Sequence, residues 1–311
     1  GLPMWLPAGN VIRDELEKLA RITEHRAGYR RVSTPHITKG ELYHRSGHLP
    51  FYADDMYAPI MIDEQEYYLR PMNCPHHHMI YAHDQWSYRD LPVRLSEYGQ
   101  VYRYEASGGL SGLMRVRGFT QDDAHVFCLP EQISDEILKI LDLTETILST
   151  FDFRNYEINL STRPEKSIGD DAVWDLATKG LTEALQRKGW DYKIDEGGGA
   201  FYGPKIDLKI EDAIGRMWQC STIQLDFNLP ERFGLEYVAA DGSRQRPIMI
   251  HRAIFGSLER FFGIMTENYA GDFPFWLAPE QVRLLPVTDE VQPYAEQVLK
   301  QLTKAGVRAT I

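Results

Sequence analysis

Three residues that lie far apart in the chain, Cys74, His125 and His251, offer one thiol and two imidazoles that could bind a single metal ion. A soft thiolate combined with imidazole nitrogens suits Zn²⁺. A structural zinc is normally closed by four protein ligands at short spacings, whereas three ligands leave a position open for substrate. We therefore expect an open zinc site whose ligands are brought together by a large fold.

A second set of residues suits the binding of a polyphosphate. Arg103 and Arg115 lie on a strand–loop–strand segment that ends at Asp123, and Arg260 follows Gly256 at the start of an expected helix. A guanidinium group presents a fixed fork of donors that matches phosphate oxygens. Arginines that converge on one site would therefore bind a phosphate-rich ligand.

The segments that must position these residues show the alternating hydrophobicity of half-buried strands. We expect strands over residues 31–37, 60–62, 67–70, 93–98, 101–105, 119–127, 153–160, 192–194, 205–210, 216–227 and 248–251. Helical spacing of apolar residues predicts helices over residues 10–29, 133–148, 171–188 and 256–268. Successive strands joined by turns predict an α+β fold, in which an antiparallel sheet of about six strands is flanked by helices.

Segments without such periodicity are expected to form loops and a domain boundary. Residues 48–57 and the glycine-rich residues 106–118 are expected loops, and residues 197–204 are an expected tight turn. The stretch 271–279 predicts a boundary, which gives a first domain of residues 1–276 and a second region of residues 277–311. That region is expected to begin an α/β domain with a strand, a helix and a strand. We expect the chain to be a fragment in which this domain is incomplete.

The composition limits the classes of partner. A formal net charge of −11 disfavours indiscriminate nucleic-acid binding, and no DNA partner is expected. No apolar run approaches the length that spans a bilayer. Three cysteines without a repeated spacing are typical of a reducing compartment, so we expect a cytoplasmic protein.

Taken together, these segments resemble the class II aminoacyl-tRNA synthetases. The helix and strand that end at Pro35 are similar to the first motif of that class, residues 103–123 to its second and residues 256–260 to its third. Residues 72–75, 121–125 and 218–227 resemble the threonyl-tRNA synthetase family in particular. The resemblance covers residues 1–276 as a catalytic domain and the remainder as the start of an anticodon-binding domain.

The resemblance implies a threonine–tRNA ligase that works with ATP, Mg²⁺ and one zinc ion per subunit, as a homodimer. L-threonine would react with ATP to give threonyl-adenylate and pyrophosphate, and the threonyl group would then pass to the 3′ end of the tRNA. Zinc would bind the amino and hydroxyl groups of threonine and so select threonine over valine.

The resemblance also implies a role for each matching residue. The zinc ligands would be Cys74, His125 and His251. The threonine-binding residues would be Met72, Gln121, Asp123, Tyr202 and Gln224, with Asp123 accepting a hydrogen bond from the substrate hydroxyl. The ATP-binding residues would be Arg103, Glu105, Arg115, Phe119, Gln219, Thr222 and Arg260, with Phe119 and Arg260 on either side of adenine. The catalytic residues would be Arg103, Lys205 and Arg260.

Some neighbouring residues are expected to be structural. His76, His77 and His78 are consecutive and cannot all face one site, so we expect surface or packing roles for them. Cys128 and Cys220 are expected to be structural, and Asp122 to be a supporting carboxylate.

Two alternatives stay open from the residues alone. One is a synthetase-like regulatory protein that senses an amino acid, although such a protein should have lost the phosphate-binding arginines. The other is a related synthetase specific for serine or proline.

Compared with threonine, serine keeps the hydroxyl group and lacks only a methyl group, which is worth about 1–3 kcal/mol. We therefore expect detectable activation of serine and almost none of valine.

Overall fold

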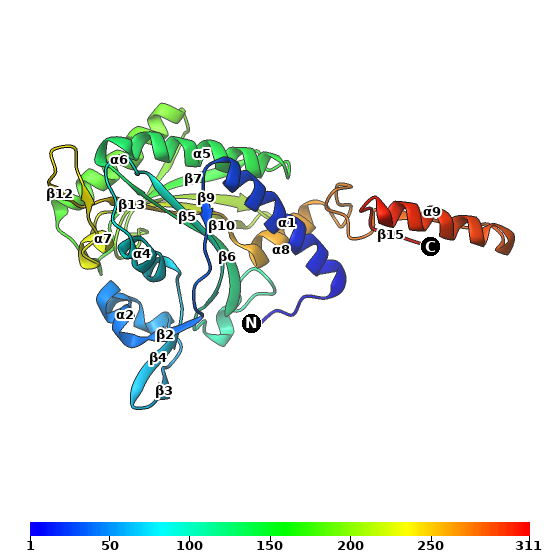
Figure 1. Ribbon diagram of the computed structural model, residues 1–311, viewed down its shortest axis with the longest axis horizontal. Helices are drawn as coiled ribbons and strands as arrows, with labels where there is room; N and C mark the ends of the chain where they lie inside the picture. The colour runs from blue at the N-terminus through cyan, green and yellow to red at the C-terminus, as the bar shows by residue number, and fades with distance from the viewer.

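The computed structural model describes all 311 residues and is built on one eight-stranded sheet (Figure 1). In spatial order its strands are β1 (Arg30–Arg31), β5 (Val93–Tyr102), β6 (Gly118–Cys128), β13 (Ile248–Ser257), β10 (Met217–Asp226), β9 (Lys205–Glu211), β7 (Tyr156–Ser161) and β8 (Lys193–Asp195). The α+β class is confirmed, with more strands than expected.

The sheet is mixed rather than purely antiparallel. Its central pairs are antiparallel, as expected, but β1 pairs parallel with β5 and β8 pairs parallel with β7. The chain passes from β7 to β8 through α6 (Asp171–Lys188). A parallel pair needs a crossover of this length, whereas a short turn can join only antiparallel neighbours.

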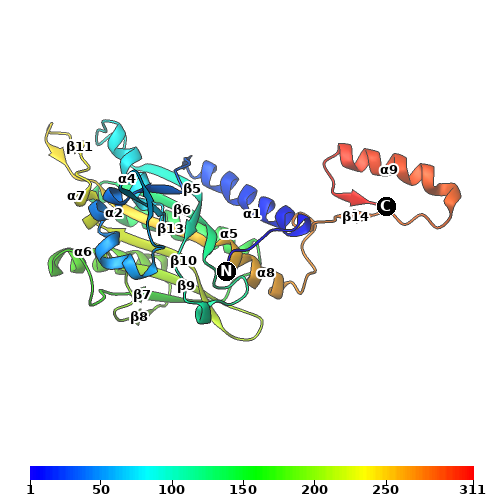
Figure 2. The same cartoon turned by 90° about the horizontal axis from the view of Figure 1, so that it is seen from below.

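Alternation along the strands gives the sheet one apolar face. On β6 the side chains of Ala124 and Val126 belong to the main core, whereas those of Asp123 and His125 face the other way. The helices with residues in this core are α1 (Pro7–Arg26), α5 (Ile133–Ser149), α6 and α8 (Leu258–Asn268). Figure 2 shows α1 lying along the sheet.

Shorter elements build up the opposite face. They are the helices α2 (Gly40–Ser46), α3 (His48–Tyr52), α4 (Cys74–His83) and α7 (Asn228–Arg232), the three-stranded sheet of β2 (Ile37–Lys39), β4 (Gln65–Leu69) and β3 (Ile60–Ile62), and the hairpin of β11 (Tyr237–Val238) and β12 (Arg244–Gln245). A second apolar cluster, which includes Tyr81, Phe127 and Met249, joins α4 to the sheet. Polar side chains of the large sheet and the shorter elements that cover this face enclose a cavity between them.

Several local expectations were wrong. No helix was expected at α4, because its buried residues lie all around it and leave no amphipathic stripe. The expected loop at 48–57 contains α3 and a 3₁₀ turn, and the expected strand at 31–37 is two short strands with a gap. Residues 93–102 form one strand, and β13 continues to Ser257.

The last residues form a small separate element. β14 (Val282–Arg283) pairs parallel with β15 (Ala309–Thr310), and α9 (Gln292–Lys304) joins them, as the sequence predicts. In Figures 1 and 2 this unit extends away from the main sheet. Arg308 connects it to α1, where its Nη1 lies 2.9 Å from Glu15 Oε1. None of the helices is long and apolar enough to cross a membrane.

Candidate metal and nucleotide site

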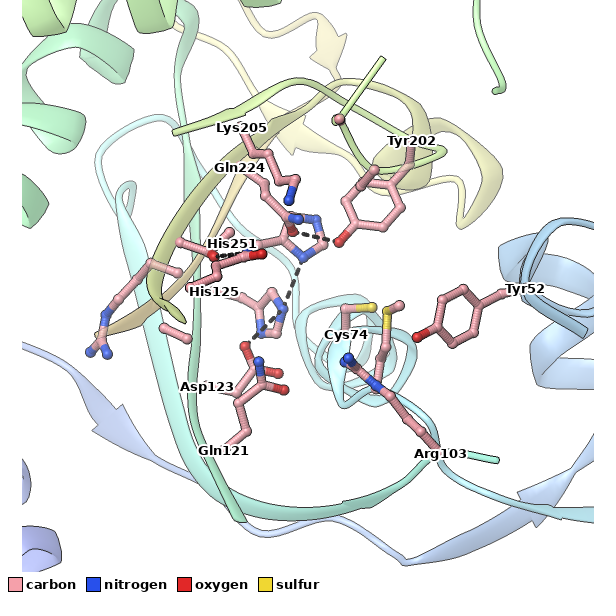
Figure 3. A pocket seen from close by; sticks show the side chains of 18 residues that line it. Tyr52, Cys74, Arg103, Gln121, Asp123, His125, Tyr202, Lys205, Gln224 and His251 are labelled. Atoms are coloured by element: carbon pink, nitrogen blue, oxygen red, sulfur yellow. Dashed lines mark hydrogen bonds and ion pairs between the residues drawn. The ribbon is translucent and has the colours of Figure 1, made fainter. Parts of the chain in front are cut away.

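The polar face of the sheet carries a cavity of about 290 Å³ that contains all three candidate metal ligands (Figure 3). Its lining consists of Tyr52, Met72, Cys74, Arg103, Gln121, Asp123, His125, Gly198, Gly199, Ala200, Tyr202, Lys205, Gln219, Thr222, Gln224, His251, Arg252 and Ala253. Every residue that the sequence analysis assigned to threonine lies in this lining.

Strand register brings the two histidines together. β6 and β13 are antiparallel neighbours in which His125 is directly opposite His251, so both side chains project from the same face. Cys74 is the first residue of α4, which packs over that face. The candidate ligand atoms of the three residues all lie within 4.8 Å of one another. The predicted grouping of these residues is confirmed.

The donor atoms fit a zinc ion. Nε2 of His125 and Nδ1 of His251 are 3.1 Å apart. Two nitrogens that bind zinc tetrahedrally, each about 2.0–2.1 Å from the ion, would be roughly 3.3 Å apart. The other ring nitrogen of His251 lies 2.9 Å from Oδ2 of Asp226, a carboxylate that can hold the ring in place.

Burial sets the ionisation of the ligands without a metal. It raises the pKa of the Cys74 thiol well above its ordinary value. It also lowers the pKa of His125 well below the ordinary value, and the neighbouring His77 and His251 lower it further. A neutral imidazole is the form that binds a metal, whereas the thiol must lose its proton on binding.

Polar groups next to the triad are held in fixed positions. Asn73 Nδ2 donates to Asp123 Oδ2 at 3.1 Å, and burial raises the pKa of Asp123. The Tyr202 hydroxyl donates to Gln224 Oε1 at 2.6 Å, and the Tyr202 ring stacks on His251 at 4.7 Å between centroids. The expected turn that positions Tyr202 is present before β9.

A buried carboxylate that the sequence analysis missed, Asp207, joins three of the assigned residues. Its Oδ2 lies 2.7 Å from Lys205 Nζ, and its Oδ1 accepts from Gln219 Nε2 at 2.7 Å and from the Thr222 hydroxyl at 2.9 Å. Asp207 lies two residues after Lys205 on one strand, so both project from the same face. That spacing was the available signal.

A second cavity, of about 250 Å³, adjoins the first and shares Arg103, Gln121, Gln219, Thr222 and Ala253 with it. All the residues assigned to ATP line it, namely Arg103, Glu105, Arg115, Phe119, Gln219, Thr222 and Arg260. The guanidinium group of Arg103 lies 5.1 Å from the ring centroid of Phe119.

Arg260 is held by backbone carbonyls. Its Nε donates to Met114 O at 2.8 Å and its Nη1 donates to Gln219 O at 2.7 Å. The bend before its helix needs Gly256, because its φ is +73° and a Cβ at this position would collide with the Cys220 carbonyl oxygen.

Asp122 holds the same bend from the apolar side of the sheet. Its carboxylate accepts the backbone N–H groups of Ile254, Phe255 and Gly256, at 2.8–3.0 Å. It lines neither cavity, as expected for a supporting carboxylate.

The histidine run of α4 differs from the expectation. His76, His77 and His78 are all buried, so a surface role is wrong. His77 follows Cys74 by three residues, and residues at this spacing share one helix face. Its Nδ1 lies 2.7 Å from Nδ1 of His125. His48 was also missed, and its Nε2 lies 3.9 Å from Cys74 Sγ.

Comparison with known proteins identifies the family. Residues 57–269 match the tRNA synthetase class II core domain (G, H, P, S and T). The threonine–tRNA ligase of Synechococcus sp. (strain CC9605) is 76% identical over the whole chain, and the chloroplastic/mitochondrial threonine–tRNA ligase 2 of Arabidopsis thaliana is 58% identical. The chain spans about half the length of these curated relatives, 51% and 48% respectively.

A solved structure agrees with these relatives. It is described as the RNA binding domain of threonyl-tRNA synthetase from Cryptosporidium parvum Iowa II. It is 42% identical, has a TM-score of 0.95, and the match covers 98% of this chain and 76% of that one. The chain therefore belongs to the class II tRNA synthetase core family and, within it, to the threonyl-tRNA synthetases.

Proposed function

We propose that this chain provides the amino-acid-activating centre of a threonine–tRNA ligase. The main support is that a metal-ligand triad and an arginine-lined cavity adjoin on one face of the sheet. Threonine and tRNA would be substrates by analogy with the relatives' names, and ATP would be the third substrate, which the arginine-lined cavity supports.

The threonine would lie in the first cavity. Cys74, His125 and His251 would hold zinc, which would supply open positions for an amino group and a hydroxyl group. Asp123, whose other oxygen is fixed by Asn73, would accept a hydrogen bond from the threonine hydroxyl. Valine has no group for this carboxylate, and leaving a buried polar group unpaired costs more than losing a methyl contact.

The nucleotide would lie in the second cavity. Arg103 lies in both cavities, so it can contact the threonine carboxylate and the α-phosphate together. Arg115 would bind the γ-phosphate, and adenine would lie between Phe119 and Arg260. Mg²⁺ would accompany the phosphates.

The reaction would need no side-chain nucleophile. The threonine carboxylate would attack the α-phosphorus in line, which gives threonyl-adenylate and releases pyrophosphate. The 3′-terminal ribose hydroxyl of the tRNA would then attack the threonyl carbonyl carbon and release AMP. The protein would contribute alignment, and its arginines would stabilise negative charge on the phosphate oxygens. Lys205, fixed by Asp207, would add a positive charge near the reacting groups.

The organisation of the protein is also part of this proposal. Residues 1–276 would be the catalytic domain and residues 277–311 the start of an anticodon-binding domain. A homodimer would form through α1 and neighbouring strands, where a cavity of about 410 Å³ is lined by residues of α1 and by Tyr29, Arg31 and Ser96. All three cysteines are free and buried, which supports a cytoplasmic or other reducing compartment.

The decisive experiment is ATP–pyrophosphate exchange with threonine, serine, valine and proline, before and after removal of zinc. We expect zinc-dependent exchange with threonine, weaker exchange with serine and almost none with valine or proline. Equal rates with valine and threonine would refute selection by zinc. Absence of exchange with any of the four, despite bound ATP, would favour a regulatory protein.

A further inference from the structure

We propose that His77 is a positioning residue, which fixes the ring nitrogen that His125 presents to the metal through a hydrogen-bond chain from Glu97. This inference rests on the proposed zinc function. It adds to that function a histidine and a carboxylate that are not themselves ligands.

The chain of contacts is continuous and shielded from water. Nε2 of His77 lies 3.1 Å from Oε2 of Glu97, and Nδ1 of His77 lies 2.7 Å from Nδ1 of His125. The exposed fractions are 3% for Glu97, 0% for His77 and 1% for His125. Water therefore cannot replace either hydrogen bond.

The ionisation of Glu97 determines which nitrogen of His77 carries the proton. Its carboxylate accepts from the Thr34 backbone N–H at 2.9 Å, from the Thr34 hydroxyl at 2.8 Å and from Arg70 Nη1 at 3.0 Å. Because one of these donors is the Arg70 cation, they favour the ionised carboxylate. An ionised carboxylate can only accept, so Nε2 of His77 must donate to it.

The tautomer of His125 is then determined. A neutral His77 that donates from Nε2 has its lone pair on Nδ1, so Nδ1 of His125 must carry the proton between the two rings. The lone pair of His125 is left on Nε2, which is the nitrogen 3.1 Å from Nδ1 of His251.

A doubly protonated His77 would reverse this order. It would donate to Nδ1 of His125, which would then carry its own proton on Nε2 and could not bind a metal through that atom. Zinc binding through Nε2 of His125 therefore goes together with a His77 ring that carries one proton, on Nε2.

The two ligand histidines are thus fixed in different ways. His251 contacts a carboxylate directly, because its Nε2 lies 2.9 Å from Asp226. Nδ1 of His125 reaches a carboxylate through His77, whereas its Nε2 lies 3.8 Å from Oδ1 of Asp123, too far for a hydrogen bond. Removal of such partners typically weakens metal binding by about 10–100-fold.

The test compares two substitutions at one position. His77→Leu removes the acceptor for His125, whereas His77→Asn places a carbonyl oxygen near the position of the original Nδ1. Both variants lose the hydrogen bond to Glu97, so a difference in zinc affinity between them reports only the acceptor for Nδ1 of His125. His76→Leu is the matched control, because His76 is buried on the same helix and neither ring nitrogen has a hydrogen-bond partner.

Zinc affinity is measured by competition with a chromophoric chelator, and zinc content by elemental analysis. We expect wild type and His76→Leu to bind one equivalent, His77→Leu to bind about 10–100-fold more weakly, and His77→Asn to recover most of the loss. Equal affinities of His77→Leu and wild type would overturn the proposal. If wild type binds no zinc, the proposed function itself fails.

A spectroscopic readout on wild type does not depend on the variants' folding. In zinc-loaded protein labelled with ¹⁵N-histidine, correlation spectra show which ring nitrogen of His125 carries a proton. We expect the proton on Nδ1. A proton on Nε2 would contradict the chain of hydrogen bonds directly.

Discussion

The metal side of the site and its nucleotide side are held in place by different means. Cys74, His125 and His251 are each at most 4% exposed, and both histidine rings have partners for their second nitrogens. On the nucleotide side the Arg115 side chain is 53% exposed and pairs only with Glu105, at 3.4 Å. The metal side is therefore pre-formed, whereas Arg115 can rearrange around a ligand.

The difference has a structural origin. The histidines lie within the paired strands β6 and β13, where neighbouring strands fix each side chain. Arg115 lies in the segment between β5 and β6 that has no long regular element. Discrimination among amino acids needs fixed polar groups, because an unpaired buried group is what rejects the wrong substrate. Phosphate binding does not need an arginine that is fixed in advance, since an exposed side chain such as that of Arg115 can move to contact the phosphate.

The largest expected effect comes from breaking the pre-formed side. We expect Cys74→Ala to lose zinc. Because zinc is the proposed contact for the threonine hydroxyl, kcat/KM for threonine in pyrophosphate exchange should fall by at least about 10³-fold. Cys128→Ala is the control, since that thiol lies in the core on the opposite face. Full activity of Cys74→Ala would remove the functional distinction between the two sides.

Substitution of Glu97, the carboxylate that contacts His77 on the metal side, gives the next largest effect. Burial alone would raise the pKa of Glu97, but the hydrogen bond from His77 and the charge of Arg70 lower it to about 2, from 4.5. The ionised Glu97 carboxylate therefore stabilises the folded protein above pH 4.5, and this stabilisation is lost as the pH falls toward 2. It corresponds to about 3 kcal/mol of unfolding free energy.

Urea unfolding at several pH values measures this effect. We expect Glu97→Gln to be less stable than wild type at pH 6, and the gap to narrow as the pH falls below 4.5. A gap that stays constant or widens in acid would show that the carboxylate charge does not stabilise this side.

Gly256 lines the nucleotide cavity and tests how rigidly Arg260 is held there. A Cβ at this position would collide with the Cys220 carbonyl, and φ is +73°. We expect Gly256→Ala to lower the unfolding free energy by roughly 1–3 kcal/mol and to raise KM for ATP through displacement of Arg260. Gly242→Ala has similar strain without the collision and should leave KM for ATP unchanged.

The smallest effect is expected on the adjustable side. Arg115→Ala should weaken ATP binding by about tenfold, and leave the unfolding free energy within about 1 kcal/mol of wild type, because exposed ion pairs contribute little. Calorimetric titration and urea unfolding measure the two quantities. A large loss of stability would show that Arg115 belongs to the pre-formed framework.

Sequence reasoning predicted which residues lie together around the two cavities better than it predicted the residues that support them. Cys74, His125 and His251 stand in long recognisable motifs, and the structure brings them together. Asp226, Asp207 and His77 were missed because their roles depend on which strand or helix face adjoins them. Helix α4 was missed because its first five residues, 74–78, are all buried, so hydrophobic periodicity could not reveal it.

Zinc K-edge X-ray absorption of the zinc-loaded protein, with and without threonine, tests the open zinc site most directly. We expect one sulfur ligand and two imidazole nitrogens from the protein, with further light-atom ligands that change when threonine is added and do not change with valine. A shell closed by four protein ligands that does not respond to threonine would contradict this expectation.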